Sequence, residues 1–219
     1  MANTLFLRLE GPLQAWGERA RWSVRDTTTE PTKSGVVGML GCALGLVEDD
    51  DLAELSRTLR MGVRCDKEGV FLTDFHTVVG GVLSAEGKVK SDTSLSWRSY
   101  LCDASFLVAL RGAPELIAHL AQSVQQPCWP VFLGRRSCVP ALPVFEGAGD
   151  FPDLLSALQA HPCQEKLEIA PAGLRVVIEV EAGMGVQRRD EVLSNRRRTF
   201  LPRYTIEQRI NPDVHQEAA

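Results

Sequence analysis

Arginine is the residue type in this sequence that points most directly to chemistry, because it occurs in three short clusters. The clusters are Arg135-Arg136, Arg188-Arg189 and Arg196-Arg197-Arg198. Between Arg175 and Arg209 the chain carries eight arginines and no lysine, against five acidic residues. The planar guanidinium group binds phosphates through paired hydrogen bonds and stacks on flat rings. The clusters therefore favour contact with nucleic acid, and a solvated loop is the alternative for the run of three.

The segment 31–46, PTKSGVVGMLGCALGL, offers a second place for an anion. Its apolar residues recur at helical spacing and its glycines fall on the opposite side, so we expect a helix that another backbone or a ligand approaches closely. Each glycine inside a helix costs roughly 1 kcal/mol relative to alanine, and close approach offsets that cost. The helix start at Thr32, Lys33 and Ser34 suits a phosphate. The glycines that a P-loop requires before its lysine are absent, which excludes that nucleotide-binding motif.

Tryptophans beside basic residues are typical of proteins that bind single-stranded RNA, because each stacked base contributes roughly 1–3 kcal/mol. Trp16, Trp22 and the pair Trp97-Arg98 fit this description. Burial in the core is the alternative for each tryptophan. His76, within DFHTVVGG, is the histidine best placed for a site, and a structural hydrogen bond is its alternative use.

The overall composition limits the class of protein. The 219 residues are 44% hydrophobic and 24% charged, as in ordinary globular proteins. A net charge of -4 argues against a free-standing nucleic-acid binder, so the arginines must act locally. The six cysteines lack the close pairs of a zinc site, which predicts reduced thiols, no metal and no cofactor. Because nothing resembles a signal peptide or a membrane span, we expect a cytoplasmic protein that does not contact membranes.

Hydrophobic patterning predicts the order strand, helix, strand, strand, helix, strand. The strands are expected at residues 4–10, 61–65, 103–111 and 129–137, and the helices at residues 31–46, from 49 to 59, and 114–126. This is the ferredoxin-like (RRM-like) pattern of an α+β protein, which RNA-recognition modules share with many unrelated domains. Residues 70–101 predict a long β-arm, and the few core-sized side chains between 80 and 94 indicate that it projects from the body.

The composition changes after Pro143. A glycine-containing linker, EGAGD, precedes a short helix expected near residues 151–160, and strands are expected at 174–180 and 199–210. We therefore divide the chain into a ferredoxin-like domain, residues 1–145, which includes the arm at about 70–101, and a small C-terminal β-rich subdomain, residues 146–219.

Five blocks of sequence carry a resemblance to a known family. They are GPLQAWG at 11–17, PTKSG at 31–35 with the glycines that follow, DFHTV at 74–78, WRSYLCDASF at 97–106 and LGRRSC at 133–138. In this order they resemble the Cas-five-type subunits of type I-E CRISPR Cascade complexes, over about the first two-thirds of the chain. The resemblance implies a ferredoxin-like domain with a protruding β-hairpin thumb and a small C-terminal β-rich part.

The resemblance also implies a function in RNA-guided antiviral defence: a non-catalytic subunit that binds the 5′ handle of the CRISPR RNA (crRNA) and caps the backbone filament. The implied partners are crRNA, a CasC-type backbone subunit, a CasA-type large subunit and, through the assembled complex, target DNA. The residues expected at the RNA are Lys33, Ser34, Gly35, Trp16, His76, Trp97, Arg98, Arg135, Arg136, Arg196 and Arg197.

Two other functions stay open. Some relatives in other CRISPR subtypes cut precursor RNA without a metal by using the neighbouring 2′-hydroxyl, and His76, Tyr100 and Lys33 are the acid–base candidates for such an endoribonuclease. A ferredoxin-like interaction domain that binds no RNA is the third hypothesis. Cleavage of repeat RNA in EDTA and the 260 nm absorbance of the purified protein distinguish the three.

Overall fold

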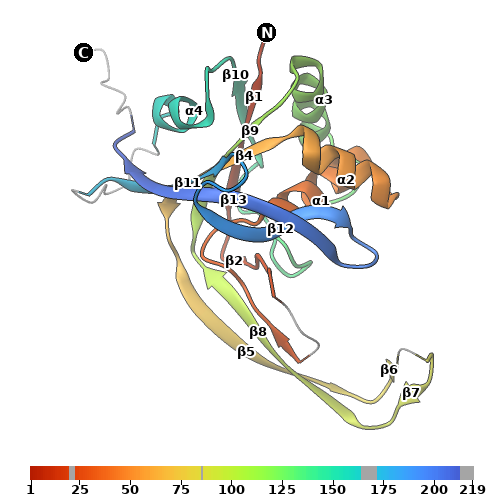
Figure 1. Cartoon of the computed structure of the whole chain (residues 1–219). Coiled ribbons are helices and arrows are strands. Elements are labelled where there is room, and N and C mark those ends of the chain that lie inside the picture. The colour runs from red at the N-terminus through yellow and green to blue at the C-terminus, as the bar shows by residue number, and fades with distance from the viewer. Residues whose placement is uncertain (20–22, 85, 164–171, 213–219) are drawn as a thin grey trace.

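The computed structural model describes residues 1–19, 23–84, 86–163 and 172–212, so Trp22 lies outside the described residues. A body of helices and sheet carries a long two-stranded arm that extends away from it (Figure 1). The arm consists of β5 (Val70–Val79) and β8 (Thr93–Cys102), as expected for residues 70–101.

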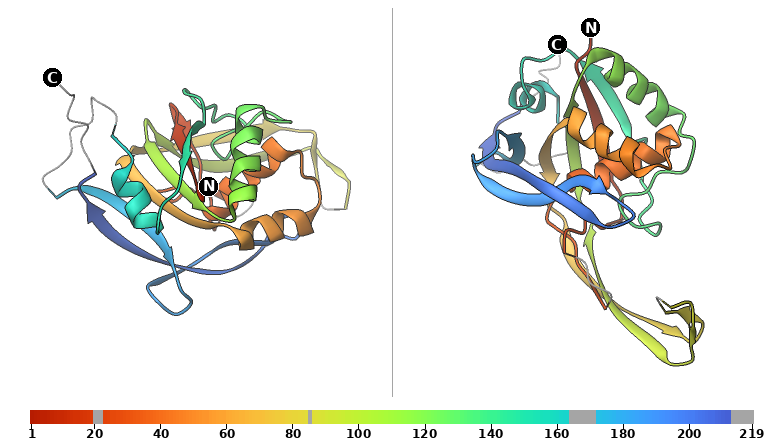
Figure 2. Two further views of the ribbon diagram at one scale, coloured as in Figure 1. Left: turned by 90° about the horizontal axis from the view of Figure 1, so that it is seen from above. Right: turned by 45° about the vertical axis from the view of Figure 1, so that its right-hand side comes forward.

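The body is built on a seven-stranded sheet with the order β10-β1-β9-β4-β11-β13-β12, in which every neighbouring pair is antiparallel. The strands are β1 (Thr4–Glu10), β4 (Arg60–Lys67), β9 (Ser105–Arg111), β10 (Phe145–Gly149), β11 (Leu174–Val180), β12 (Val186–Ser194) and β13 (Thr199–Ile210). Three helices cover one face: α1 (Lys33–Leu44), α2 (Asp49–Thr58) and α3 (Pro114–Gln125), and α4 (Leu154–Ala160) lies on the other (Figure 2).

Helices on both faces explain why the central strands read as nearly continuous apolar runs. Along β1, Leu5, Leu7 and Leu9 join the core beneath α1, α2 and α3. Phe6, between them, points to the opposite face and joins a smaller core beneath α4. Successive side chains of a strand point to opposite faces, so a strand covered on both sides buries all of them.

Patterning located the strands at 4–10, 174–180 and 199–210 and the helix near 114–126, and the structure confirms these elements. The strand expected at 129–137 is wrong. That segment carries no strand, and the N–H groups of Cys128 and Trp129 donate to the carbonyls of Ala43 and Cys42, at the C-terminal end of α1. The strand that flanks β1 is β10 instead, which includes the EGAG expected to be a linker. Glycine has a low strand propensity, so the sequence did not indicate this strand. The pairing with β1 outweighs that low propensity.

Strands from both halves of the chain share one sheet. β11 pairs with β4 over residues 175–178, and β13 and β12 follow outward from β11. Contacts of Glu30 with Arg175 and of the Lys33 N–H with Asp190 place these strands against the segment that leads into α1.

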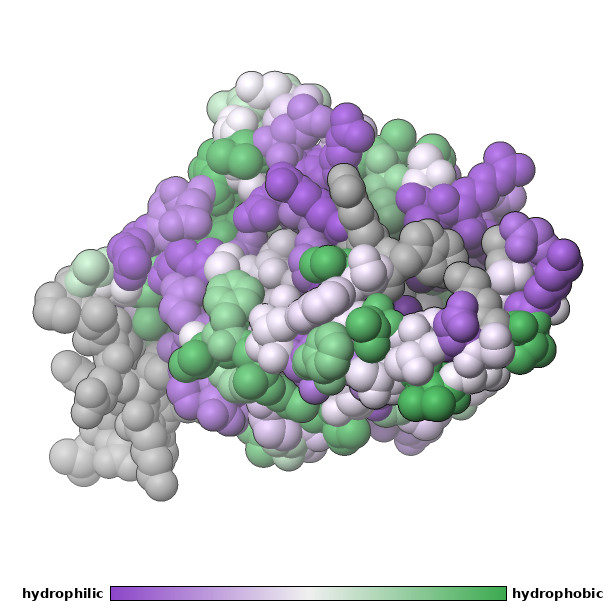
Figure 3. Space-filling view, turned by 90° about the horizontal axis from the view of Figure 1, so that it is seen from below, coloured by the Kyte–Doolittle hydropathy of each residue, from purple (hydrophilic) through white to green (hydrophobic). Residues whose placement is uncertain are grey.

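The arm has a regular antiparallel register from Val70 opposite Cys102 to Val79 opposite Thr93. Near the body, β2 (Leu13–Gln14) and β3 (Val24–Arg25) pair with β8, and β6 (Val82–Leu83) and β7 (Val89–Lys90) form the tip. Both faces of the outer arm are open to solvent. The view from the arm side in Figure 3 shows hydrophobic side chains interspersed with weakly polar ones there.

The glycines of α1 serve different purposes. A Cβ on Gly35 would lie 2.8 Å from the Trp16 ring, and one on Gly41 would lie 2.5 Å from the Leu52 side chain. Gly45 ends the helix in the left-handed conformation, with φ of 75°. A Cβ on Gly38 would have nothing within 4 Å. Internal packing therefore explains Gly35 and Gly41, whereas Gly38 faces open space.

Candidate nucleic-acid interface

A cleft of about 920 Å³ opens on the Gly38 side of α1. One wall is the N-terminal half of α1, and the others are residues 15–19 and 25–26, the turn between β12 and β13, and Gly134 with Arg135. Four arginines line it: Arg19, Arg25, Arg135 and Arg198. The cleft therefore combines a wall without side chains at Gly38 with a rim of guanidinium groups.

Arg25 lies at the centre of a group of like charges. β3 pairs in parallel with β8 so that Arg25 lies beside Arg98. Partial burial lowers the pKa of Arg25, and the positive charges of Arg98, Arg135 and Arg198 lower it further. A bound anion would relieve this repulsion, which is why clusters of arginine recognise phosphate groups.

Arg135 has internal hydrogen-bond partners. Its guanidinium group donates to the carbonyl of Ser99 at 2.8 Å and to the carbonyls of Arg25 and Asp26 at 2.9 and 3.2 Å. Its Cζ lies 4.6 Å from the centre of the Tyr100 ring. Arg135 therefore joins the base of the arm to the segment that carries Arg25, and Arg136, next in the chain, is exposed.

Lys33 does not line the cleft. Its ammonium group is 3.1 Å from a carboxylate oxygen of Glu179 and 3.5 Å from one of Glu191, and its side chain is 2% exposed. The backbone N–H of Lys33 donates to Asp190 at 2.8 Å. The expected phosphate site at the start of α1 thus holds an internal carboxylate, and we revise the role of Lys33 to an ion pair that docks α1 on the C-terminal strands.

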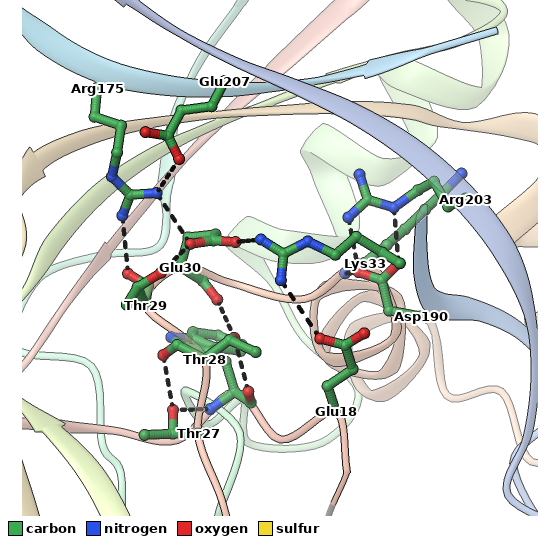
Figure 4. Close-up of polar contacts among 12 residues, drawn as sticks. Glu18, Thr27, Thr28, Thr29, Glu30, Lys33, Arg175, Asp190, Arg203 and Glu207 are labelled. Atoms are coloured by element: carbon green, nitrogen blue, oxygen red, sulfur yellow. Dashed lines mark hydrogen bonds and ion pairs between the residues drawn. The ribbon is translucent and has the colours of Figure 1, made fainter. Parts of the chain in front are cut away.

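A network of buried charges surrounds this docking point (Figure 4). Glu30 binds Arg175 at 3.0 Å and also binds Arg188, which reaches Glu18 at 3.4 Å. Arg203 binds both carboxylate oxygens of Asp190, at 2.8 and 2.7 Å. The network satisfies charges that burial would otherwise make costly.

Asp190 gives the network a pH dependence. Burial acts to raise the pKa of Asp190, but the hydrogen bonds and charge of Arg203 and the N–H of Lys33 outweigh it and lower the pKa below the ordinary 3.8. A carboxyl group with a lowered folded-state pKa stabilises the fold above its unfolded pKa, and that stabilisation is lost as the pH falls through the folded pKa.

We therefore expect the free energy of unfolding to fall as the pH drops below about 5, and to fall less in Asp190→Asn over the same interval. Urea unfolding at a series of pH values measures both slopes. Asp150→Asn, at an exposed carboxylate outside the network, is the control and should keep the wild-type loss. An Asp190→Asn slope equal to that of wild type would show that Asp190 carries none of the acid sensitivity.

Trp16 also differs from its sequence-based expectation. Its side chain is 1% exposed, and its indole N–H donates to Gln14 at 2.9 Å. It packs behind Gly35, so we revise Trp16 from a stacking platform to a support for the cleft wall. Ser34 and Gly35, which were also expected at the RNA, line the cleft.

On the arm, Trp97 is 44% exposed, and its ring centre lies 5.3 Å from that of Phe75. His76 lies 3.8 Å from Asp74 on the opposite face of the same strands. The three acid–base candidates are not brought together. Tyr100 lies opposite Leu72, four residues along β5 from His76, and Lys33 is buried among glutamates.

The turn between β12 and β13 carries the run of three arginines. Arg196 and Arg197 are exposed, and Arg196 lies 3.9 Å from Glu48. Arg198, with a positive φ of 50°, is the member that lines the cleft. Our sequence-based selection missed Arg198 and Arg25, although Arg198 adjoins two selected residues and Arg25 lies in the arginine-bearing loop before α1.

No group of three or more His, Cys, Asp or Glu side chains that could hold a metal ion occurs in the described ranges. Among the helices of the same ranges, none has the length and apolar character needed to cross a membrane.

Comparison with known proteins gives one consistent family. The family described as CRISPR-associated protein (Cas_Cas5) matches residues 4–212. The chain is 40% identical over 171 residues to the CRISPR system Cascade subunit CasD of Escherichia coli (strain K12). The aligned stretch covers 72% of this chain and 76% of that protein.

Two solved structures agree with this family. One, titled "Crystal structure of Cas protein", has a TM-score of 0.72 and 36% identity, and the match covers 94% of this chain and 93% of that one. The other, titled "CRISPR RNA-guided surveillance complex", has a TM-score of 0.73 and 32% identity, with 94% and 90% covered. The likeness therefore continues past the first two-thirds of the chain, into the C-terminal strands.

Proposed function

Because this chain belongs to the Cas5 family of CRISPR-associated proteins, we propose that it is a non-catalytic subunit of a Cascade-type surveillance complex. In this proposal it binds the 5′ handle of crRNA and caps one end of the backbone filament. The observation that carries the proposal is the cleft: an arginine rim faces the open Gly38 side of α1, at the base of an arm with exposed aromatic rings.

The chemistry of the cleft fits a single strand of RNA. Arg25 and Arg198 supply charge for backbone phosphates, and the Gly38 wall lets a sugar or base approach the helix closely. Trp97 and Phe75 offer ring faces for an unpaired base. Arg98, Arg136, Arg196 and Arg197 extend the positive surface beyond the cleft. A net charge of -4 is compatible with this role because the subunit would meet RNA inside a larger assembly.

The same proposal assigns roles to parts of the fold. The four strands in the order β10-β1-β9-β4, with α1, α2 and α3, are the ferredoxin-like unit, and β5 with β8 is the thumb. The remaining strands, β11, β12 and β13, are the C-terminal part that supports the cleft. A CasC-type backbone subunit and a CasA-type large subunit are the neighbouring proteins, and base pairing by the guide reads target DNA.

Arg25→Ala and Arg198→Ala test the proposal. Each removes one charged contact, so we expect RNA affinity to fall about tenfold or more for each. Each should also reduce the slope of log affinity against log salt by about 0.7, the value for one phosphate of a single strand. Fluorescence anisotropy with a labelled single-stranded RNA copied from the host's CRISPR repeat measures both quantities.

Arg57→Ala, on α2 and away from the cleft, is the control and should bind as wild type does. Wild-type affinity and salt slope in both cleft variants would place the RNA elsewhere on the molecule.

A further inference from the structure

Arg188 is one of the arginines on the C-terminal strands that face the body of the protein, together with Arg175 and Arg203. Arg188 lies on β12, and its guanidinium group bridges two carboxylates of the segment before α1. One nitrogen binds Glu30, and the other lies 3.4 Å from Glu18. The side chains of Glu18 and Glu30 are 10% and 6% exposed, so both contacts lie in surroundings where water competes weakly.

These two carboxylates lie near the two ends of one loop. Between them the chain runs through the segment that carries Arg25. Inside the loop, the Thr28 N–H donates to the carbonyl of Trp16 at 2.8 Å, and the Trp16 N–H donates to the Thr27 hydroxyl at 2.8 Å. Figure 4 shows Thr27 and Thr28 together with Glu18 and Glu30. These hydrogen bonds join the beginning of the loop to its end. Glu18 and Glu30, the partners of Arg188, lie two residues beyond these bonds in the chain.

We propose that Arg188 is a positioning residue: it fixes the described part of this loop, residues 16–19 and 23–30, against β12 and so holds Arg25 at the cleft without touching the RNA. This inference rests on the proposed RNA-binding function of the cleft. Ordering a residue costs about 1–2 kcal/mol of backbone entropy, so a loop that is fixed in advance binds more tightly than one that RNA must order. Arginine suits the task because its planar fork reaches two carboxylates at once.

The neighbouring residue provides a matched control. Arg189 is exposed, and its backbone N–H, which any side chain leaves in place, donates to Glu18 at 3.2 Å. Arg188→Ala and Arg189→Ala thus remove the same charge from adjacent positions of one strand, but only the first removes the guanidinium contacts to Glu18 and Glu30. The contacts that Arg175 and the Arg189 N–H make with the loop remain in both variants.

Two measurements on the full chain separate positioning from direct contact. In Arg188→Ala we expect amide hydrogen exchange in the loop, at residues 16–19 and 23–30, to become faster by about tenfold or more, as the loss of a charged hydrogen bond implies. We expect affinity for the labelled repeat RNA to fall by about tenfold with an unchanged salt slope, in contrast to the reduced slope of Arg25→Ala. Arg189→Ala should match wild type in loop exchange.

Arg188→Lys keeps a positive charge in the partly buried site but cannot bridge both carboxylates, so it gives the same signature in weaker form if Arg188→Ala does not fold. Wild-type exchange of the loop in Arg188→Ala would overturn the inference, and so would a salt slope reduced as in Arg25→Ala. If wild-type protein fails to bind RNA at all, the proposed function fails, and the exchange measurement still decides whether Arg188 fixes the loop.

Discussion

Gly38→Leu is expected to abolish RNA binding while the protein stays folded. The Cβ position at Gly38 has open space within 4 Å and borders the cleft, so a leucine side chain at this position enters the cleft. Leucine is also the better helix former by roughly 0.5–1 kcal/mol, which should keep the free energy of unfolding close to that of wild type. A side chain that fills the approach to the helix removes at least two contacts of roughly 1–3 kcal/mol each, so affinity should fall by about a hundredfold or more.

Anisotropy with the labelled repeat RNA and urea unfolding of the same preparation measure the two effects. Gly38→Ala is the graded control: its methyl group meets nothing, so stability should rise slightly and affinity should change little. Gly35→Leu is the opposite control, since its side chain must displace Trp16 and should lower stability. Full RNA affinity in a folded Gly38→Leu protein would show that the RNA does not occupy this cleft.

Arg64→Ala is expected to cause the largest loss of stability. The Arg64 side chain is fully buried and binds both oxygens of Asp66, at 2.6 and 3.2 Å. It also donates to the carbonyls of Leu158, His161 and Pro162, at 2.6, 2.5 and 3.1 Å, at the C-terminal end of α4. Removal leaves these acceptors buried with fewer donors and leaves a cavity behind.

Breaking a buried charge network in this way costs roughly 3–5 kcal/mol, a large share of the 5–15 kcal/mol typical of a folded domain. Urea unfolding followed by circular dichroism measures the loss. Arg60→Ala is the matched control on the same strand, because Arg60 pairs with the exposed Glu181 and such surface pairs contribute about 0–1 kcal/mol. Equal losses in the two variants would show that burial does not set the energy of these arginines.

The predictions for Gly38 and Arg64 depend on elements that the sequence predicts and on contacts between elements that it does not. The helix that contains Gly38 was predicted from apolar spacing, and its glycine side was recognised as a place of close approach. Which glycine faces the cleft was not predictable, because the answer depends on Trp16 and Leu52, which approach from other elements. Arg64 lies within a strand that was predicted correctly, but nothing in its local pattern shows that α4 ends against it.

The arginines illustrate the same limit. Their clustering and the lack of lysine were evident in the sequence, and so was the family, through the five blocks of resemblance. The sequence alone did not show which guanidinium groups face the cleft and which are used inside the protein. Arg135 was expected at the RNA and lines the cleft, but its guanidinium group is used in hydrogen bonds to three carbonyls, whereas Arg25 was overlooked and also lines the cleft.

The sequence by itself determined most helices and strands, the projecting arm and the family, because these depend on periodicity and on residues close together in the chain. Only the tertiary structure decided which charged side chains form internal ion pairs and which line the cleft. Lys33 and its partner Asp190 are 157 positions apart, and Arg188 and Glu30 are 158 apart. A charge that meets its partner across such a separation leaves no periodic signal, so its use in an ion pair or at a ligand is fixed when the C-terminal strands join the sheet.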